Sequence, residues 1–327
     1  MPTPKYRYFE YMKRIQPITG FPLLALMMIN MISACKTTEP SGYLFAYFKG
    51  NGEDGLHLAH SADGFHWKAL HGDSSFLTPA AGVDHLMRDP CIIQGGDGQY
   101  HMVWTVSWNE RGIGYASSPD LINWSPQKYI PVMEEEPTAR NCWAPEIYFD
   151  SPSGTYLIYW ATTIPGRFPE TDSLGDSGYN HRMYCTTTRD FVYFTPTRLF
   201  YDPGFNVIDA TIRHIDHQYV MFLKNETLLP EAEKNIRMAT SDSLMGPYSP
   251  ASPPISGHWV EGPTAIHLDT GWIVYFDRYQ EHRMGAILSP DLKHWVDVSD
   301  RLVFPEGTRH GTVFRPSAKT LSKIDHQ

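Results

Sequence analysis

The sequence is poor in the features that mark several large classes of protein. Its 327 residues contain 27 Lys and Arg against 36 Asp and Glu, which gives a formal net charge of −9. This deficit of positive charge argues against a nucleic-acid partner. The sequence also lacks the motifs of P-loop nucleotide binding, of the serine hydrolase nucleophile elbow and of the HExxH zinc site. Its chemistry must therefore come from other residues.

Cysteine is scarce, with 4 residues, and no two of them form a CxxC pair. Cys35 lies in the N-terminal segment, and Cys91, Cys142 and Cys185 follow it. Because three is an odd number, at least one of these later thiols is free or pairs with another chain. Cys91 and Cys142 lie in apolar stretches typical of strands, where cysteine acts as a small buried hydrophobe.

An apolar run preceded by positive charge lies near the N-terminus. Lys13 and Arg14 precede the stretch FPLLALMMINMI (residues 21–32), and small residues follow it. This order is typical of a secretory signal, and the stretch is short for a membrane span. The sequence ISAC (residues 32–35) resembles a bacterial lipobox, which would make Cys35 a lipidated N-terminus.

We therefore predict a lipoprotein signal peptide over residues 1–35 and a tether over residues 36–42. The protein would be anchored by lipid in a bacterial cell envelope, in the periplasm or at the outer-membrane surface. Its contact with the membrane would be through this anchor alone. An ordinary signal peptide cleaved nearby is the alternative.

The rest of the chain is rich in aromatic residues, which make up 13% of the sequence, and in short segments typical of strands. A phrase of a small or hydroxyl residue, then Asp, then an aromatic residue recurs along it. The five copies end at Trp67, Trp124, Phe194, Tyr248 and Trp295. Each follows an apolar run such as TYLIYWA (residues 155–161). Units of about 50 residues with about four strands each are typical of β-propellers.

A second phrase opens every unit except the first. It reads RDPCII from residue 88, WAPEIYF from 143, DATIRHI from 209 and EGPTAIHL from 261. A related segment, HGTVF from His310, stands near the end of the chain with no unit after it. This position indicates that the C-terminal strand completes the first blade, which would remove exposed sheet edges. We predict an all-β fold, a five-bladed β-propeller over residues 43–316, followed by a tail over residues 317–327.

The residues that open the inner strands of a propeller meet near its axis. Here they are Asp89, Glu146, Asp209, Glu261 and His310. Carboxylates that lie close together repel one another, and at least one of them has its pKa raised. A protonated and an ionised carboxyl group side by side are what glycoside hydrolysis requires. Trp143, in the same phrase as Glu146, could stack on a sugar ring.

The segments RDP, WAPE, IDAT and EGP, one per blade and in this order, resemble glycoside hydrolase family 43. The resemblance extends from about residue 43 to 314, and the family consists of five-bladed propellers that act mainly on arabinofuranosides and xylosides, with inversion. It implies that Asp89 is the general base and Glu261 the general acid. Asp209 would modulate the pKa of the acid and orient the substrate.

The resemblance also implies further site residues. Arg283, in the segment EHRMG, corresponds to an arginine that often contacts the substrate, and Glu146 stands where the family usually has Asp. With Arg88 and Trp143, these are the expected substrate-binding residues. His310 corresponds to a central histidine near a calcium ion or a water cluster. The channel could therefore hold a structural calcium near His310, while no cofactor is expected to be required.

The sequence thus predicts an inverting glycoside hydrolase that acts on plant-type oligo- or polysaccharides, as an α-L-arabinofuranosidase or a β-xylosidase. Three alternatives stay open. They are a β-galactofuranosidase, a glycoside phosphorylase whose phosphate would meet Arg140, Arg283 and Arg309, and a surface lipoprotein that binds glycans without cleaving them. The insertion over residues 163–184 is expected to wall the pocket on one side. We expect a carbohydrate substrate and a monomer.

Overall fold

The computed structural model describes residues 42–324. The predicted signal peptide, its lipobox and all but the last residue of the tether lie outside this range. The described residues belong to the unit Glu39–Gln327 and form mostly antiparallel strands. No helix within residues 42–324 has the length and apolar character needed to cross a bilayer.

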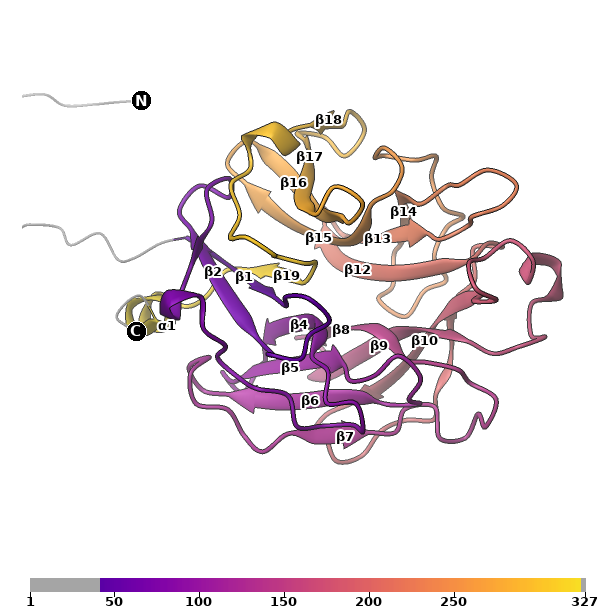
Figure 1. The fold of residues 1–327 in the computed structure, drawn as a ribbon, viewed down its shortest axis with the longest axis horizontal. Helices are drawn as coiled ribbons and strands as arrows, with labels where there is room; N and C mark the ends of the chain where they lie inside the picture. Colours follow the sequence, from indigo (N-terminus) through magenta and orange to yellow (C-terminus); the bar gives the residue numbers. More distant parts are fainter. Residues whose placement is uncertain (1–41, 325–327) are drawn as a thin grey trace, which may run out of the picture. The chain divides into compact units, whose positions relative to one another are not determined.

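The strands form five sheets around a common axis, which confirms the predicted five-bladed propeller (Figure 1). From the axis outward, the first blade contains β19 (Thr312–Phe314), β1 (Tyr43–Tyr47), β2 (His57–Ser61) and β3 (Lys68–Ala69). The second blade contains β4 (Arg88–Gln94), β5 (Tyr100–Thr105), β6 (Ile113–Ser118) and β7 (Lys128–Ile130).

The third blade contains β8 (Trp143–Asp150), β9 (Thr155–Thr163), β10 (His181–Thr188) and β11 (Arg198–Tyr201). The fourth has three strands, β12 (Val207–Ile215), β13 (Gln218–Asn225) and β14 (Asn235–Ser241). The fifth contains β15 (Glu261–Leu268), β16 (Gly271–Arg278), β17 (Arg283–Ser289) and β18 (Val296–Asp297). Three short 3₁₀ helices lie between strands, at His71–Asp73, Pro169–Thr171 and Ser299–Arg301.

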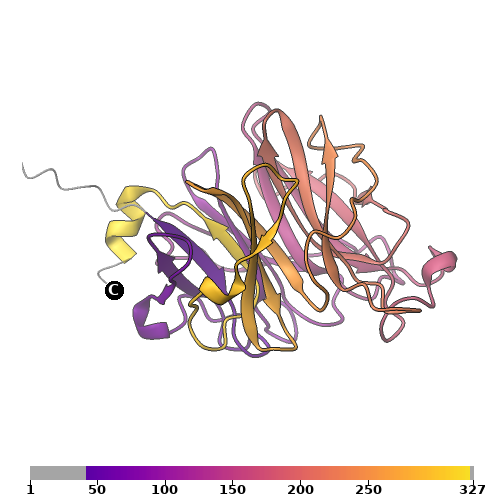
Figure 2. The same ribbon diagram turned by 90° about the horizontal axis from the view of Figure 1, so that it is seen from above.

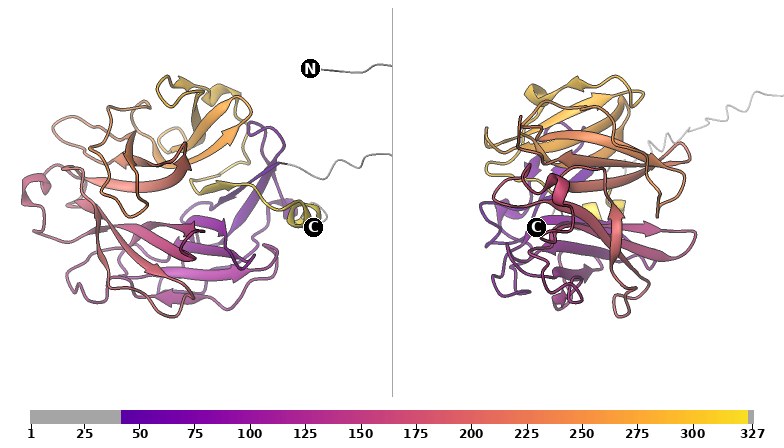
Figure 3. Two further views of the ribbon diagram at one scale, coloured as in Figure 1. Left: turned by 180° about the vertical axis from the view of Figure 1, so that it is seen from behind. Right: turned by 90° about the vertical axis from the view of Figure 1, so that its right-hand side faces the viewer.

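The C-terminal strand closes the ring, as the sequence predicts. Strand β19 pairs antiparallel with β1, and Phe45 lies opposite Val313. Seen from behind, β19 is the yellow strand that lies beside the indigo strands of the first blade (Figure 3). Because the closing strand comes from the end of the chain, the first blade joins segments that are more than two hundred residues apart in sequence.

The predicted tail forms part of the fold. Residues 318–324 make helix α1 (Ala318–Ile324), which lies beside the first blade (Figure 2). Leu321 and Ile324 are buried in the apolar layer between the first two blades. Thr320 accepts a hydrogen bond from the hydroxyl group of Tyr100 at 3.0 Å.

The core consists of apolar layers between neighbouring blades, one for each of the five junctions. Cys91 and Cys142 lie in the layer between the second and third blades, and Cys185 in the layer between the third and fourth. All three thiols are free and buried, and burial raises the pKa of each one. They therefore act as small apolar side chains, as expected for Cys91 and Cys142.

The recurring Asp phrase forms a turn that follows the third strand of a blade. In the second blade, the Ser118 hydroxyl group accepts the N–H groups of Asp120 and Leu121. The Asp120 carboxylate then accepts the next two N–H groups, and the Trp124 indole donates to the carbonyl group of Leu121 at 3.1 Å. The Asp residues of the equivalent turns are Asp63, Asp190 and Asp291. Local bonding of this kind explains why the phrase recurs.

Candidate active site

Four of the five inner strands carry the same irregularity near their first residue. The register to the next strand shifts between Arg88 and Cys91, Trp143 and Glu146, Ile208 and Thr211, and Glu261 and Thr264. The second residue of each stretch has a positive φ, 54° at Asp89, 44° at Ala144, 53° at Asp209 and 61° at Gly262. Such bulges re-aim side chains, so this repeated local geometry directs residues of these four blades toward the axis.

The five residues predicted to meet near the axis do not all hold the same position relative to these bulges. Asp89 and Asp209 hold the second position, Glu261 stands one residue earlier, and Glu146 stands two residues later. His310 lies two residues before β19. The two-residue offset of Glu146 places it in a different part of the channel.

Three predicted catalytic carboxylates line one open cavity of about 420 Å³, namely those of Asp89, Asp209 and Glu261. Predicted site residues Arg88, Trp143 and His310 line it as well. The remaining named side chains of the lining are Asn51, Thr105, Trp108, Ile208, Lys224, Glu226 and Arg309. The fold therefore brings together residues from all five blades at the position that the repeats predict.

Asp89 is held as a carboxylate. Its Oδ1 lies 2.6 Å from Nε2 of His310, and its Oδ2 accepts a hydrogen bond from the Thr105 hydroxyl group at 2.7 Å. Burial would raise its pKa, but His310, Arg88 and Thr105 together hold this pKa well below its usual range. Burial would likewise lower the pKa of His310, but Asp89, Asp209 and Glu261 raise it to about 9. At neutral pH the two residues form an ion pair.

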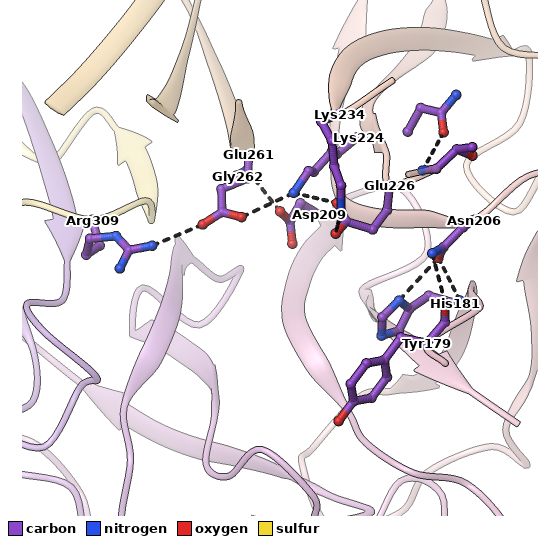
Figure 4. A network of polar contacts seen from close by, with 12 residues as sticks. Tyr179, His181, Asn206, Asp209, Lys224, Glu226, Lys234, Glu261, Gly262 and Arg309 are labelled. Atoms are coloured by element: carbon purple, nitrogen blue, oxygen red, sulfur yellow. Dashed lines mark hydrogen bonds and ion pairs between the residues drawn. The ribbon is translucent and has the colours of Figure 1, made fainter. Parts of the chain in front are cut away.

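Glu261 lies between two cations, as Figure 4 shows. Its Oε2 lies 3.2 Å from Nζ of Lys224, and its Oε1 accepts a hydrogen bond from Arg309 at 3.1 Å. Burial raises the pKa of Glu261, but Lys224, His310 and Arg309 outweigh burial and lower this pKa to about 2. A general acid needs a raised pKa, so the role that the resemblance implies for Glu261 predicts one. This expectation is wrong for the free site because close cations dominate over desolvation.

Asp209, rather than Glu261, is the carboxyl group with the raised pKa. Its Oδ2 accepts the backbone N–H of Gly262 at 3.0 Å (Figure 4). Burial raises the pKa of Asp209 to about 6, with Glu261 and Asp89 adding to the shift and His310 and Lys224 opposing it. Because no cation contacts Asp209 as closely as Lys224 and Arg309 contact Glu261, a proton shared by these two acids resides on Asp209.

The ion pairs around Glu261 extend into a chain of alternating charges. Lys224 Nζ lies 2.5 Å from Glu226 Oε2, and Lys234 contacts the other oxygen of Glu226. At the other end, Arg309 Nε donates to Asp277 Oδ2 at 2.5 Å. In order, the chain runs through Lys234, Glu226, Lys224, Glu261, Arg309 and Asp277. It holds the Glu261 carboxylate in place from both sides.

Sequence reasoning missed most of this chain. Lys224 ends the apolar run QYVMFLK, and a charged residue at the end of a buried strand is the signal that could have identified it. For Arg309 the sequence suggests only a role as a phosphate ligand, although this residue directly precedes His310, one of the residues expected near the axis. Its ion pair with Glu261 joins the fifth blade to the closing segment, and such a pair is invisible until the ring is closed.

Gly262 is required by the approach of His310. A Cβ atom at residue 262 would lie 1.7 Å from Nδ1 of His310, and the φ of 61° also favours glycine. The EGP phrase therefore contains glycine because the closing segment packs directly against it.

Two predicted substrate-binding residues lie elsewhere. Glu146 lines a smaller cavity of about 20 Å³, which Asp89, Asp209 and His310 also line, and it accepts a hydrogen bond from the Thr211 hydroxyl group at 3.0 Å. Burial raises its pKa to about 7, against the opposing effect of Arg213. Arg283 pairs with Glu281 at 2.8 Å and with Asp300 at 3.3 Å, and it lines another cavity. Arg309 is the arginine that reaches the carboxylates.

The surroundings of His310 do not fit a metal site. Its Nε2 faces Asp89 Oδ1 at 2.6 Å, so this nitrogen is already engaged by a carboxylate. Within residues 42–324, no group of three or more His, Cys, Asp or Glu side chains is arranged to hold a metal ion. Calcium therefore enters no step of the chemistry derived below.

Trp143 lies on the wall of the cavity, where the sequence places a sugar-stacking residue. Its ring packs edge-on against Trp108, with centroids 5.3 Å apart, and its indole N–H donates to the carbonyl group of Trp108. Tyr179 packs on Trp143 at 4.6 Å. The insertion over residues 163–184 therefore reaches the site by supporting Trp143, while other segments line the cavity.

Comparisons with known proteins give the family and the fold of this chain. An α-L-arabinofuranosidase of Bifidobacterium longum subsp. longum is 27% identical over 264 residues, covering 66% of this chain and 25% of that protein. The chain thus spans about a quarter of the length of this curated relative.

Solved structures of two bacterial proteins share the fold. An endo-1,4-β-xylanase of Bacteroides thetaiotaomicron gives a TM-score of 0.59 at 12% identity, covering 81% of this chain and 94% of that chain. A family 43 protein of Bacillus licheniformis gives 0.54 at 14% identity, covering 85% and 57%. These likenesses show the fold alone. The family described as a probable glycosyl hydrolase domain, related to family 43, matches residues 39–320. Since this match covers most of the chain, the protein belongs to the glycosyl hydrolases related to family 43.

Proposed function

We propose that this protein hydrolyses glycosidic bonds with inversion, with Asp89 as general base, Glu261 as general acid and Asp209 as the modulator of the acid. The observation that carries the proposal is that these three carboxylates, from three blades, line one cavity. Inversion requires a water molecule between the base and the sugar, so an inverting pair stands roughly 6.5–9.5 Å apart. We expect Asp89 and Glu261 to have this separation.

Asp89 is suited to the role of base because it is ionised and fixed. His310 and Thr105 hold its two oxygens, which leaves the carboxylate oriented while it accepts a proton from water. The proton leaves the water as its oxygen forms the bond to the anomeric carbon. The protonated His310 balances the negative charge of the site before the reaction.

Glu261 must receive a proton before it can protonate the leaving oxygen. In the free site Asp209, with its pKa near 6, holds the proton of this pair of acids. A sugar hydroxyl group that donates a hydrogen bond to Asp209 stabilises the ionised form of Asp209. The proton then passes from Asp209 to Glu261. Substrate binding in this way produces the acid only when a sugar is present.

The substrate we propose is an arabinofuranoside or a xyloside in a plant oligo- or polysaccharide. The curated relative at 27% identity is named an α-L-arabinofuranosidase, which supports the first of the two. A β-galactofuranoside remains the third candidate. A phosphorylase has less support, because of Arg140, Arg283 and Arg309 only Arg309 lines the cavity and it is already paired with two carboxylates.

The test is a panel of aryl glycosides of arabinofuranose, xylose and galactofuranose, with the first-formed product anomer followed by NMR. We expect turnover of one of these with inverted configuration, unchanged by added phosphate. Glu261→Gln should reduce turnover of unactivated glycosides by about 10³-fold or more. Glu281→Gln, a surface substitution of the same type, should leave the rate unchanged.

Normal turnover by Glu261→Gln, or a product of retained configuration, would contradict the proposed roles of Asp89 and Glu261. Saturable glycan binding without turnover of any glycoside would instead support the glycan-binding lipoprotein. Turnover that requires phosphate would support the phosphorylase. The experiment therefore distinguishes the glycosidase from both the glycan-binding lipoprotein and the phosphorylase.

A further inference from the structure

Trp108 exposes a large aromatic surface inside the active-site cavity. It lies three residues after Thr105, whose hydroxyl group holds Asp89, and 40% of its surface is exposed. Leaving an indole ring in water forgoes stabilisation that burial would provide. We propose that Trp108 is a stacking platform for a second sugar residue, adjacent to the sugar bound among the carboxylates. This inference rests on the proposed function and specifies which part of the substrate the site recognises.

The ring of Trp108 is fixed by contacts from three blades. Its indole N–H donates to Oδ1 of Asn51, in the loop after β1, at 3.0 Å. The Arg88 guanidinium lies over the ring, 4.3 Å from its centroid, and also donates to Asn51 at 3.0 Å. Trp143 packs edge-on against it and bonds to its backbone. An aromatic side chain held in this way loses little conformational entropy when a ligand binds.

These contacts also determine which part of the Trp108 side chain a ligand can reach. Arg88 covers one face of the indole, and Asn51 occupies its only hydrogen-bond donor. The 40% of Trp108 that stays exposed in the cavity therefore offers a ligand apolar aromatic surface, which suits the C–H face of a sugar ring. Arg88 itself lies between the rings of Phe48 and Trp108, so its predicted role in substrate binding is to hold this platform.

The charges of the cavity favour a neutral ligand next to this face. Lys224 and Arg309 are paired with Glu261, and His310 is paired with Asp89. A phosphate or carboxylate ligand would have to compete with these internal partners. A neutral, hydroxyl-rich chain competes less, and it extends past the sugar held at the carboxylates toward Trp108.

The experiment compares an aryl monoglycoside with an oligosaccharide of the same sugar, using kcat and KM for each. Trp108→Ala should raise KM for the oligosaccharide about tenfold more than it raises KM for the aryl monoglycoside. Trp108→Phe, which keeps an aromatic face, should retain most of the affinity. Trp108→Leu keeps the apolar volume without the aromatic ring, and it should behave like Trp108→Ala even if the alanine variant is unstable.

The control is Tyr193→Ala, which removes an aromatic ring that is 79% exposed in the turn after β10 and lies outside the cavity. This variant should change neither substrate's constants. An equal rise in KM for both substrates, or no rise in KM for the oligosaccharide in Trp108→Leu, would contradict the proposal that Trp108 is a stacking platform.

A binding measurement separates this inference from the proposed reaction. Calorimetric titration of the oligosaccharide into Glu261→Gln, with and without Trp108→Leu, should show about a tenfold loss of affinity for the double variant. If no glycoside is cleaved by the native protein but this difference persists, the reaction is refuted and the platform stands. If cleavage is confirmed but the affinities are equal, the platform is refuted.

Discussion

Lys224 places its ammonium group between the carboxylates of Glu226 and Glu261, while the residue as a whole is buried. A buried ammonium group is stable only because both partners are close. Burial raises the pKa of Asp209, and His310 and Lys224 lower it, so Lys224 helps to set the pH at which the pair of acids loses its proton. With Asp209 near 6, kcat/KM should fall above about pH 6 in the native protein.

Replacing Lys224 with Met tests this control. Removing the cation raises the pKa values of Glu261 and Asp209, so their shared proton is retained to higher pH. The alkaline limb of the kcat/KM profile should move upward by about one pH unit. The matched control is Lys323→Met, which removes a surface cation 3.5 Å from Asp120. Equal profiles for Lys224→Met and the native protein would contradict the assignment.

At the scale of single residues, the sequence predicts position better than charge state. Asp89, Asp209 and Glu261 were identified because each opens a repeated phrase. The pKa of Glu261 could not be predicted, because burial and close cations act in opposite directions and contacts near 3 Å decide between them. The sequence also did not predict the position of Arg283. Glu281, two residues before it, pairs with its guanidinium group outside the cavity that the carboxylates line.

Among the elements, the turns after the third strands are the most regular feature of the fold. In four blades an Asp accepts backbone N–H groups of the turn, at Asp63, Asp120, Asp190 and Asp291. The copy in the fourth blade differs. There Asp242 accepts a side-chain hydrogen bond from Gln218, and Ser241 caps the turn. The fourth blade therefore provides a natural comparison.

Asp120→Ala removes the acceptor for two backbone N–H groups and should lower the free energy of unfolding by about 1 kcal/mol. Asp242→Ala removes one exposed side-chain contact and should cost less than about 0.5 kcal/mol. Urea denaturation of both variants measures the difference. Equal destabilisation would show that the repeated phrase reflects composition rather than local bonding.

The bulges of the inner strands could not be read from the sequence. Their second residues are Asp89, Ala144, Asp209 and Gly262, and of these glycine adopts a positive φ freely, Asp tolerates it and Ala disfavours it. The others adopt it because the ring forces the inner strands to turn their first residues toward the axis. The carboxylates thus owe their convergence to tertiary packing, which local propensity does not encode.

At the scale of the whole described unit, ring closure was predictable and helix α1 was not. The segment HGTVF repeats the phrase that opens the blades, so its partner was identifiable. The helix has seven residues, too few for a clear amphipathic period, and its stability comes from the burial of Leu321 and Ile324.

Two truncations separate these contributions. A chain that ends after Ser317 loses α1 and should be destabilised by about 3 kcal/mol, the order expected for two buried aliphatic side chains. A chain that ends after Gly311 also loses β19 and leaves β1 unpaired on its axial side. We expect no cooperative thermal unfolding of the second chain. Cooperative unfolding near the native temperature would show that the closing strand is dispensable.

Strand β1 is made early, but its partner β19 comes from the far end of the chain. The first blade therefore cannot be completed until synthesis or translocation of the chain is nearly finished. Whether the polypeptide emerges from a ribosome or from a translocation pore, four sheets can form while β1 still presents unsatisfied backbone groups. Only after residue 314 has emerged can that edge be covered. The interval before then is when the nascent protein is most exposed to aggregation and has the greatest need of a chaperone.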